Sequence, residues 1–457
     1  MLFIAIIKRM DISLNWILFI PYVNIKYTTM KAIKITLSLI FSILYINSFG
    51  QLTIGAQIRP RAEFRNGFKT LTTKERNPAF FIEQRSRFFA DYNSDKFEVK
   101  INFQDVRIWG STDQIYKSET GTLTNIYEAW GLYRLNRNWQ FKIGRMDLDY
   151  NNARFLGDLD WAAQGRSHDA LVISYKTDSS DFRLDIGGAF NQSGFEPTKL
   201  SETFYTGLNN YKTMQFIWVN KKFNNSEISA IIHNDGQQIQ SDSSIAFRQT
   251  YGLMASGKLN KFNFTAEAYV QSGKNAAEND VNAYMLSASL SIPTPLTPIT
   301  FGFDMLSGSS INDINDKSFN PLYGTNHKFY GFMDYFYVGN THGQQGKVAG
   351  LIDIFLKTKF KVNTNSNLVA HTHIFNSAAD IYNPENLTSS VSKYLGTELD
   401  IVYNYTFDKD VVLNIGYSQM LAGESMEYIK AAAGDHEAFN NWVWLMISFH
   451  PKVVLNK

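Results

Sequence analysis

The sequence predicts an all-β protein, a single transmembrane antiparallel β-barrel of about 18 strands with short periplasmic turns and long extracellular loops. Apolar and polar residues alternate with period two in segment after segment, as on strands whose two faces meet different surroundings. The predicted strands run about 10–15 residues, against about 5–6 in globular proteins and about 9–11 needed to cross a membrane. Short and long connections also alternate along the chain. Alternating faces alone would fit a soluble sandwich, but the strand lengths and the sorted connections favour a membrane barrel.

Composition narrows the classes of function. The chain has 457 residues, no cysteine, 15% aromatic residues and a formal net charge of +2. The absence of cysteine excludes disulfides, thiolate metal sites and cysteine nucleophiles. Because the net charge is close to zero, we expect no nucleic-acid partner. The mean hydropathy of −0.23 is too polar for a helical membrane protein but is compatible with a barrel that has a wet interior.

The segment that starts at Met30 has the three parts of a secretory signal peptide. Two lysines follow the methionine, an apolar run covers 35–46, and the small residues Ser48 and Gly50 provide a cleavage site. A run of this length is too short to span a bilayer. We therefore expect a signal peptide over 30–50 and export to the cell outer membrane.

The regions on either side of this signal complete the expected organisation. Residues 1–29 are expected to be an over-extended start that is not part of the mature protein, with a membrane anchor in 12–29 as the alternative. No linker or shift in composition divides the rest, so 51–457 is expected to form one barrel domain. The predicted strands are 51–64, 79–92, 96–109, 124–135, 138–146, 167–177, 181–191, 211–223, 226–234, 246–258, 262–272, 281–292, 298–307, 346–361, 366–376, 391–406, 410–421 and 440–450.

The face of each strand that meets lipid is predicted from its alternation. In 51–64 the even positions are mostly apolar and the odd positions are mostly polar or charged. Apolar and polar residues alternate in the same way in three further segments, 97–104, 182–190 and 395–405, and Leu395 is expected on the apolar face of the last. We expect the apolar faces to contact outer-membrane lipid and the polar faces to line the lumen.

The last predicted strand carries aromatic residues close to the C-terminus. Trp442, Trp444 and Phe449 are expected to belong to an aromatic girdle at the membrane interface. A strand of this kind is also expected to be the signal that the outer-membrane assembly machinery recognises.

Arginine is distributed unevenly along the chain. Of 15 arginines, 13 fall between Arg59 and Arg183, and only Arg248 follows. Acids interleave with them on the polar strand faces, so one interpretation is a ladder of salt bridges that stiffens one side of a wide barrel. The other is an electropositive strip whose planar guanidinium groups bind the carboxylates of a solute. The two interpretations are compatible. The candidate pore-lining and substrate-binding residues are Arg59, Arg61, Arg85, Arg87, Arg107, Arg134, Arg145, Arg154, Arg166, Arg183, Glu83, Glu98, Glu128, Asp169, Asp185, Glu398 and Asp400.

Residues 144–169 leave the strand pattern and form a loop dense in arginine and acids. Its spacing is carried by Gly144, Arg145, Arg154, Gly157, Trp161, Gly165, Arg166 and Asp169. In this loop, and at 321–336, 394–418 and 441–451, the chain resembles the alginate export porin family. The resemblance implies an outer-membrane barrel of about 18 strands whose lumen conducts polysaccharides or anions and is lined by arginines and counter-acids.

The expected function is passive passage of anionic saccharides or similar small anionic solutes. The strands beyond Arg183 offer mainly lysines and acids, whereas the resemblance implies a pore that is positive around its circumference, so alginate itself is not the expected solute. One alternative is a plugged structural or adhesive barrel whose long loops bind partners. A barrel enzyme is a weaker alternative, because the sequence indicates no acid–base or nucleophile constellation near the rim. No cofactor is expected.

The longest predicted loop, 308–345, is too aromatic for free solvent. We expect it to fold into the lumen as a constriction or gate, or else to cap the outer mouth. The candidate gating residues are Tyr323, His327, Tyr330 and Asp334.

Three further patterns have a plainer explanation. His371 and His373 share a strand face and could bind a metal, but the sequence indicates no third ligand, so no metal site is expected. The segment 311–318 is rich in Asp and Asn without EF-hand spacing, which fits a turn-rich loop better than a calcium site. Asp158 and Asp160 could act as acid and base, but loop carboxylates in a pore more often provide charge lining.

Overall fold

A computed structural model gives the structure of the chain, with one compact unit that begins at Gly50. Apart from this glycine, the expected signal peptide and the region 1–29 lie outside the described residues. The structure describes residues 50–112, 124–193, 205, 207, 210–239, 241, 244–430 and 434–456.

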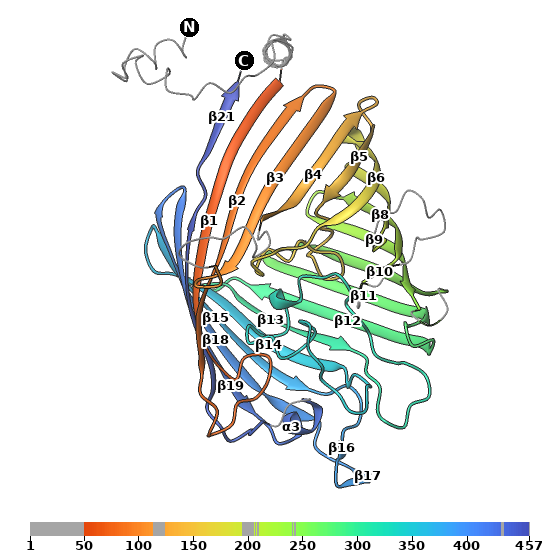
Figure 1. Ribbon diagram of the computed structural model, residues 1–457, viewed down its shortest axis with the longest axis vertical. Coiled ribbons are helices and arrows are strands. Elements are labelled where there is room, and N and C mark those ends of the chain that lie inside the picture. The colour runs from red at the N-terminus through yellow and green to blue at the C-terminus, as the bar shows by residue number, and fades with distance from the viewer. Residues whose placement is uncertain are drawn as a thin grey trace, which may run out of the picture. The chain divides into compact units, whose positions relative to one another are not determined.

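The strands form one closed antiparallel sheet in which each strand pairs with its neighbours along the chain (Figure 1). Their bounds are β1 Gly50–Asn66, β2 Ala79–Ser94, β3 Phe97–Ile108, β4 Thr124–Arg134, β5 Trp139–Met146, β6 His168–Thr177, β7 Phe182–Phe190, β8 Thr213–Lys222, β9 Ser226–Gln238, β10 Ile245–Leu259, β11 Phe262–Lys274, β12 Asp280–Ile292, β13 Ile299–Leu306, β14 Leu351–Lys361, β15 Ser366–Asn376, β18 Tyr394–Asp408, β19 Val411–Ala422, β20 Asn440–Phe449 and β21 Lys452–Asn456. Each of them lies where the alternation predicts a strand, except that β21 extends the last predicted strand.

The barrel closes between the first and the last strand. Both β20 and β21 pair with β1, and only His450 and Pro451 separate them. Proline lacks the N–H that a strand ladder needs, so it fits at such an interruption. Counted as one strand, β20 and β21 complete a ring of 18 strands in the described part of the chain, as the sequence predicts.

The remaining elements are short and lie in the connections. Strands β16 (Tyr382–Asn383) and β17 (Asn386–Ser390) form a separate hairpin between β15 and β18. The helical elements are η3 (Asp178–Ser180), η4 (Asn326–Lys328) and α3 (Ser425–Ile429). Among the described residues, no helix is long and apolar enough to span a membrane.

The connections are sorted between the two rims. One rim has short turns at 95–96, 135–138, 178–181, 223–225, 260–261, 293–298, 362–365 and 409–410. The other rim has the loops 67–78, 109–123, 147–167, 191–212, 239–244, 275–279, 307–350, 377–393 and 423–439.

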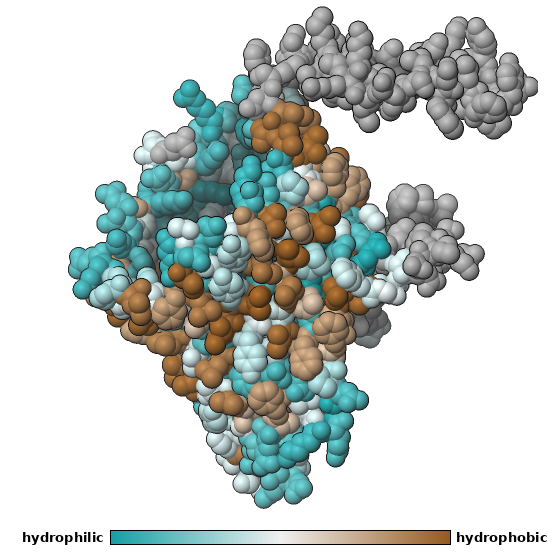
Figure 2. Space-filling model, turned by 90° about the vertical axis from the view of Figure 1, so that its left-hand side faces the viewer, coloured by the Kyte–Doolittle hydropathy of each residue, from teal (hydrophilic) through white to brown (hydrophobic). Residues whose placement is uncertain are grey.

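The two faces of the wall differ as predicted. On β1 the side chain of Ile58 is 49% exposed, whereas the next residue, Arg59, is 6% exposed and faces the interior. Phe97 on β3 and Ile186 on β7 also point outward. Figure 2 shows hydrophobic side chains crossing the middle of one outer face, with hydrophilic ones above and below. This band is the surface that a lipid bilayer would cover.

Two expectations about the apolar face are wrong. Trp442 and Trp444 do not belong to an outer girdle, because their positions on β20 point inward and their side chains are 0% and 5% exposed, whereas Phe449 points outward. Leu395 is also buried inside. The pairing of β15 with β18 shifts at this point and leaves Leu395 without a register partner, so a β-bulge turns its side chain to the interior.

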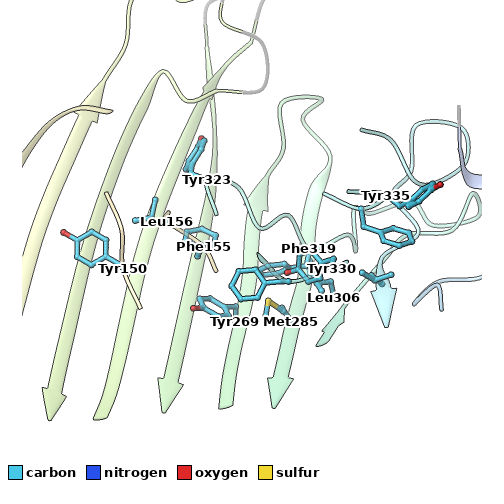
Figure 3. Packing of buried hydrophobic residues seen from close by; sticks show 14 of the residues in the cluster. Tyr150, Phe155, Leu156, Tyr269, Met285, Leu306, Phe319, Tyr323, Tyr330 and Tyr335 are labelled. Atoms are coloured by element: carbon cyan, nitrogen blue, oxygen red, sulfur yellow. The ribbon is translucent and has the colours of Figure 1, made fainter. Parts of the chain in front are cut away.

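Two long loops from the same rim fold into the barrel, and we call them the inner loops. They are the β5–β6 loop, residues 147–167, and the β13–β14 loop, residues 307–350. Leu156 of the first and Tyr323 of the second form a parallel bridge. Figure 3 shows inner-loop side chains, among them Phe155, packed beside Tyr269 from the wall. The interior is therefore a packed contact between wall and loops.

Candidate functional site

Asp160 in the β5–β6 loop holds three guanidinium groups of the barrel wall. Arg59 on β1 lies opposite Arg85 on β2 in the strand register, and Arg87 follows two residues later. The Asp160 carboxylate lies 2.8 Å from Arg85, 3.4 Å from Arg59 and 3.5 Å from Arg87. Its backbone carbonyl also accepts hydrogen bonds from Arg59 at 2.8 Å and Arg85 at 3.1 Å. One residue of the loop thus offsets the repulsion between three neighbouring cations.

The electrostatics of the β5–β6 loop follow from burial and from these ion pairs. Burial raises the pKa of a carboxyl group, but Arg85, Arg59 and Arg87 outweigh it and hold the pKa of Asp160 below its ordinary value. Burial lowers the pKa of Arg166 to about 10. Both side chains remain charged near neutral pH, so the loop is held by ionic hydrogen bonds.

Arg61 connects the same loop to two wall carboxylates. It pairs with Glu63 at 2.9 Å and with Glu83 on the neighbouring strand. It also donates to the backbone carbonyl of Trp161 at 2.9 Å and lies 4.2 Å from the centre of the Trp161 ring. Glu63 in turn accepts a hydrogen bond from the indole of Trp442 at 2.9 Å, which explains why that tryptophan points inward.

Trp161 is also where the two inner loops meet. Its ring stacks on His327 of the β13–β14 loop, with 4.4 Å between ring centres and 8° between planes. The edges of Trp442 and Trp444 on β20 complete the contact. Oδ1 of Asp334 lies 2.6 Å from Nδ1 of His327, and this hydrogen bond orients the histidine ring. The two loops form one continuous structure across this part of the lumen.

Arg154 fixes the β5–β6 loop to the far side of the ring. It binds both oxygens of Asp304 on β13 at 2.9 Å and lies 3.5 Å from Glu267 on β11. Its guanidinium also lies 3.7 Å from the centre of the Phe329 ring and donates to the hydroxyl of Tyr330 at 3.3 Å. The side chain is buried, so the position predicted to line the pore is an internal anchor.

The candidate gating residues are all buried inside the barrel. Tyr323 donates a hydrogen bond to Asp235 on β9, and the Tyr323 backbone carbonyl accepts one from Arg166. Tyr330 and Asp334 have the partners described above. Of the two positions expected for the β13–β14 loop, these residues therefore occupy the first, inside the lumen, and not the outer mouth.

The other predicted pore residues form ion pairs along the wall. Three of these pairs face the interior: Arg134 with Glu98 at 3.1 Å, Arg183 with Asp185 at 2.7 Å and Lys100 with Glu128 at 2.7 Å. Arg183 is the more accessible of the two inward arginines, with a side chain 50% exposed against 27% for Arg134. The inward pairs have the form of the salt-bridge ladder, and the guanidinium group of Arg183 keeps a face open to solutes.

The predicted pore positions of Arg107, Arg145 and Asp169 are wrong, because these side chains lie on the outer face. Arg107, paired with Asp105 at 2.7 Å, lies opposite Gln84 and not beside the inward Arg85. Arg145 pairs at 3.0 Å with Asp169, which lies between the buried, inward His168 and Ala170.

Charge is divided between two parts of the inner wall. The arginine wall is formed by β1 and β2 together with Asp160, and it carries Arg59, Arg61, Arg65, Arg85 and Arg87 against Glu63, Glu83 and Asp160. The acidic wall lies on β11, β13, β14 and β18, and it carries Glu267, Asp304, Asp353, Glu398 and Asp400 against Arg154 and Lys357. In the closed ring β19 and β20 separate the acidic wall from β1, so the inner surface has an arginine-rich part and an acid-rich part.

A cavity of about 340 Å³ lies inside the barrel next to the β5–β6 loop. Lys142 and Arg183 contribute positive charge to its lining, and Glu98 and Asp147 contribute negative charge. Trp130 supplies an aromatic surface, with the Lys142 ammonium 4.1 Å from its ring centre. These residues lie on the side of the loop that faces the rim of short turns. The cavity can hold a small polar solute that carries charge and an apolar face.

Residues 50–439 match the alginate export family. The chain belongs to the alginate export family. The match covers most of the chain and almost all of the described barrel, and it agrees with the resemblance that the motifs indicate. No curated protein matches the sequence.

Solved structures similar to this alginate export family member are porins. OccK1 (OpdK) of Pseudomonas aeruginosa is 9% identical with a TM-score of 0.55, covering 88% of this chain and 99% of that one. OccD3 (OpdP) of the same organism is 11% identical with a TM-score of 0.54, covering 88% and 91%. OccAB4 of Acinetobacter baumannii is 11% identical with a TM-score of 0.53, covering 88% and 98%. At these identities the likeness shows the fold.

Family and fold together make this alginate export family member an outer-membrane barrel and a channel for solutes, with its apolar band in contact with lipid. Sequence reasoning missed the residues that organise its interior. Asp160 appeared only as one of two loop acids, and Trp161 only as part of a motif. Asp304 and Asp353 were not singled out, although their parity on β13 and β14 places them on the inner face.

The structure brings a third side chain to His371 and His373. The sequence does not indicate this side chain, because it comes from another strand. Asp400 on β18 lies opposite His371 in register, and the three side chains lie together on the inner wall.

Proposed function

We propose that this channel passes small anionic solutes, carboxylated saccharides above all, passively along the arginine wall. The observation that carries the proposal is the local charge: five guanidinium groups face three carboxylates on β1, β2 and the β5–β6 loop. Such an excess attracts anions, and planar guanidinium groups bind carboxylates in two-point contacts.

The inner loops set how a solute would move. They fill the middle of the lumen, so a solute meets the arginine wall and the cavity lined by Lys142 and Arg183 in separate steps. Conduction needs binding that is favourable but weak and divided over several sites. Spaced, partly neutralised arginines meet that requirement better than one tight pocket. We also place the short turns on the periplasmic side and the long loops outside, as is usual for such barrels.

Ion selectivity in planar bilayers tests the anionic path. The wild-type channel should be anion-selective, and replacing Arg59, Arg87 and Arg183 together with glutamine should shift the reversal potential toward cation selectivity. Arg137→Gln is the matched control, because Arg137 lies in an exposed turn outside the lumen. A cation-selective wild type that the triple variant does not alter would overturn the proposal.

A plugged barrel is the second candidate, and a specific observation favours it. Arg154, Asp304 and Glu267 form a buried ion cluster that ties an inner loop to the wall. Liposome swelling separates the two functions. Entry of small sugars into liposomes carrying the wild type supports a channel, whereas no swelling, with swelling restored by shortening the β13–β14 loop, supports a plug.

We further propose that β20 and β21 provide the signal for the outer-membrane assembly machinery, and that the protein acts as a transporter and not as an enzyme. The terminal position of these strands supports the first statement. The family and the porin fold support the second.

A further inference from the structure

A cluster of metal-ligating side chains lies on the inner wall, apart from the arginine wall and the cavity. His371 and His373 are two residues apart on β15 and share its inner face, and Asp400 comes from the neighbouring strand β18. One ligand atom from each of the three side chains lies within 4.8 Å of the others. This separation lets one ion touch all three groups after small rotations of the side chains.

Each of the three side chains has a ligand atom without a hydrogen-bond partner among the described residues. His373 is 0% exposed, and its Nε2 makes no hydrogen bond. Asp400 is 1% exposed and its Oδ2 is likewise without a donor, as is the Nδ1 of His371. Buried polar atoms are normally satisfied, so three orphans in one cluster indicate a missing partner.

In each of the two buried side chains, His373 and Asp400, the other polar atom is held in place by a neighbouring residue. Oδ2 of Asp353 on β14 lies 2.8 Å from Nδ1 of His373, so Nε2 is the nitrogen of that ring left available to an ion. The hydroxyl of Ser418 donates to Oδ1 of Asp400 and leaves Oδ2 free. A carboxylate behind a ligating histidine is the usual way in which proteins fix the ring and raise its basicity. Asp353 is therefore a positioning residue of the cluster.

Charge around the cluster favours a divalent cation. The acidic side chains of Asp353, Glu398 and Asp400 outnumber the one lysine beside the histidines, Lys357, which lies opposite His371 in register on β14. Buried charges are normally paired or bound to metals.

We propose that His371, His373 and Asp400 bind one divalent transition-metal ion of the zinc type, with a further position open to water or solute. Nitrogen and carboxylate ligands without thiolates suit zinc and its neighbours better than magnesium or calcium. The ion would stiffen the wall near Glu398. This carboxylate accepts a hydrogen bond at 2.8 Å from the backbone N–H of Met333 in the β13–β14 loop. The inner loop would then be held more firmly when metal is bound.

Metal binding to the purified full chain in detergent tests the proposal. Chelator-treated protein is titrated with Zn²⁺ alone and, in parallel, with Co²⁺, whose visible spectrum reports nitrogen and oxygen ligands. We expect about one ion per chain and a zinc-dependent rise in unfolding temperature. His371→Gln and His373→Gln should each abolish both effects, and Asp353→Asn should weaken binding by about 10- to 100-fold.

His233→Gln is the matched control, since His233 is a fully buried wall histidine on β9 whose ring nitrogens also make no hydrogen bond among the described residues. It should bind metal like the wild type. A shared proton between Glu398 and Asp400 is the competing explanation of the cluster, and it predicts no Co²⁺ spectrum in the wild type. That result, or equal binding by wild type and a His371→Gln/His373→Gln double variant, would overturn the proposal. The wild-type spectrum decides the matter even if a variant fails to fold.

Discussion

At the scale of single residues, the carboxylate of Asp160 offsets the positive charge of three arginines on the wall. Arg59, Arg85 and Arg87 lie close enough to repel one another, and the side chain of Asp160 contacts all three. The carboxylate is 53% exposed, so water screens part of this attraction. Backbone carbonyls of the same loop, such as that of Trp161, provide the rest of the neutralisation. The loop therefore completes the wall electrostatically as well as sterically.

Replacing Asp160 with asparagine should release the loop and free the arginines for anions. We expect a shift of the reversal potential toward anion selectivity and faster hydrogen exchange in the β5–β6 loop. Asp149→Asn is the control, because it makes the same charge change in the same loop at an exposed side chain that pairs with no arginine among the described residues. Equal behaviour of the two variants would contradict the assignment.

The same ion pairs predict an acid dependence of the loop. The pKa of Asp160 is lower in the folded protein than its ordinary value of about 3.9. Its contribution to stability is therefore fully present above that ordinary value and is lost as the pH falls through the lower, folded value. Loop protection against hydrogen exchange should decline below about pH 4 in the wild type. In Asp160→Asn this decline should be smaller.

Arg154 should have a larger effect because it is buried. Arg154→Met leaves Asp304 and Glu267 without their cation, and breaking one side of a buried ion pair costs about 3–5 kcal/mol. Native-state hydrogen exchange of the β5–β6 loop measures this free energy of opening. A triple variant that adds Asp304→Asn and Glu267→Gln should recover much of it. If the triple variant is no more stable than Arg154→Met, the loss does not come from the unpaired acids.

At the scale of elements, the inner loops are held by contacts that span the ring. The β5–β6 loop reaches the arginine wall through Asp160 and the acidic wall through Arg154, and the β13–β14 loop reaches β18 through Met333. Backbone conformation permits the last contact. Gly331 has a φ of +82°, and a Cβ there would lie 2.6 Å from a carboxylate oxygen of Glu398. The chain can approach this acid closely only because position 331 is glycine.

Gly331→Ala should weaken the attachment of the β13–β14 loop to Glu398 on β18. A non-glycine residue at positive φ costs about 1–3 kcal/mol, and the clash with Glu398 adds to it. Gly339→Ala is the control, because Gly339 has a φ of +67° and nothing within 4 Å of its Cβ position. Hydrogen exchange of Met333 should rise more in the first variant than in the second. Equal exchange would mean that contact with Glu398 contributes nothing.

The elements themselves could be predicted, but their interior contacts could not. Period-two alternation places the strands because it is a local property of the backbone. A bulge is an exception to that rule, and Leu395 turns inward through one. The partners of Asp160 and of Arg154 lie far away in sequence, and no local pattern encodes which loop enters the lumen. Aromatic content indicated that the β13–β14 loop enters the lumen, but nothing in the sequence indicated this for the β5–β6 loop. The acids that bind both loops became visible only with the closed ring.

At the scale of the whole molecule, stability depends on closure between β1 and the broken last strand. The segment β21 pairs with Gln51–Gly55 of β1, and without it these residues would form an open edge. Unpaired backbone groups in a bilayer are costly, because lipid offers them no hydrogen bonds. Pro451 interrupts the strand, yet its carbonyl accepts a hydrogen bond from Ala56 at 3.1 Å and keeps the seam aligned.

Deleting residues 452–457 should lower the temperature at which the barrel unfolds in detergent, measured by the shift between folded and unfolded bands in gels. The cause would be the lost ladder between β21 and β1. A chain with the same six residues in scrambled order keeps backbone pairing and should stay near the wild type. Equal unfolding temperatures for deletion and wild type would show that β21 is dispensable.

The seam also dictates an order of events during biogenesis. Trp442 and Glu63 are joined by a hydrogen bond although 379 positions separate them in the chain. Loop-closure entropy makes so distant a contact slow to form. Because synthesis runs from the N-terminus, β1 with its row of arginines must wait as a free edge until the final residues have crossed the inner membrane. The rate of maturation would then be limited by how well a chaperone protects that edge. The speed of local hairpin formation would not limit it.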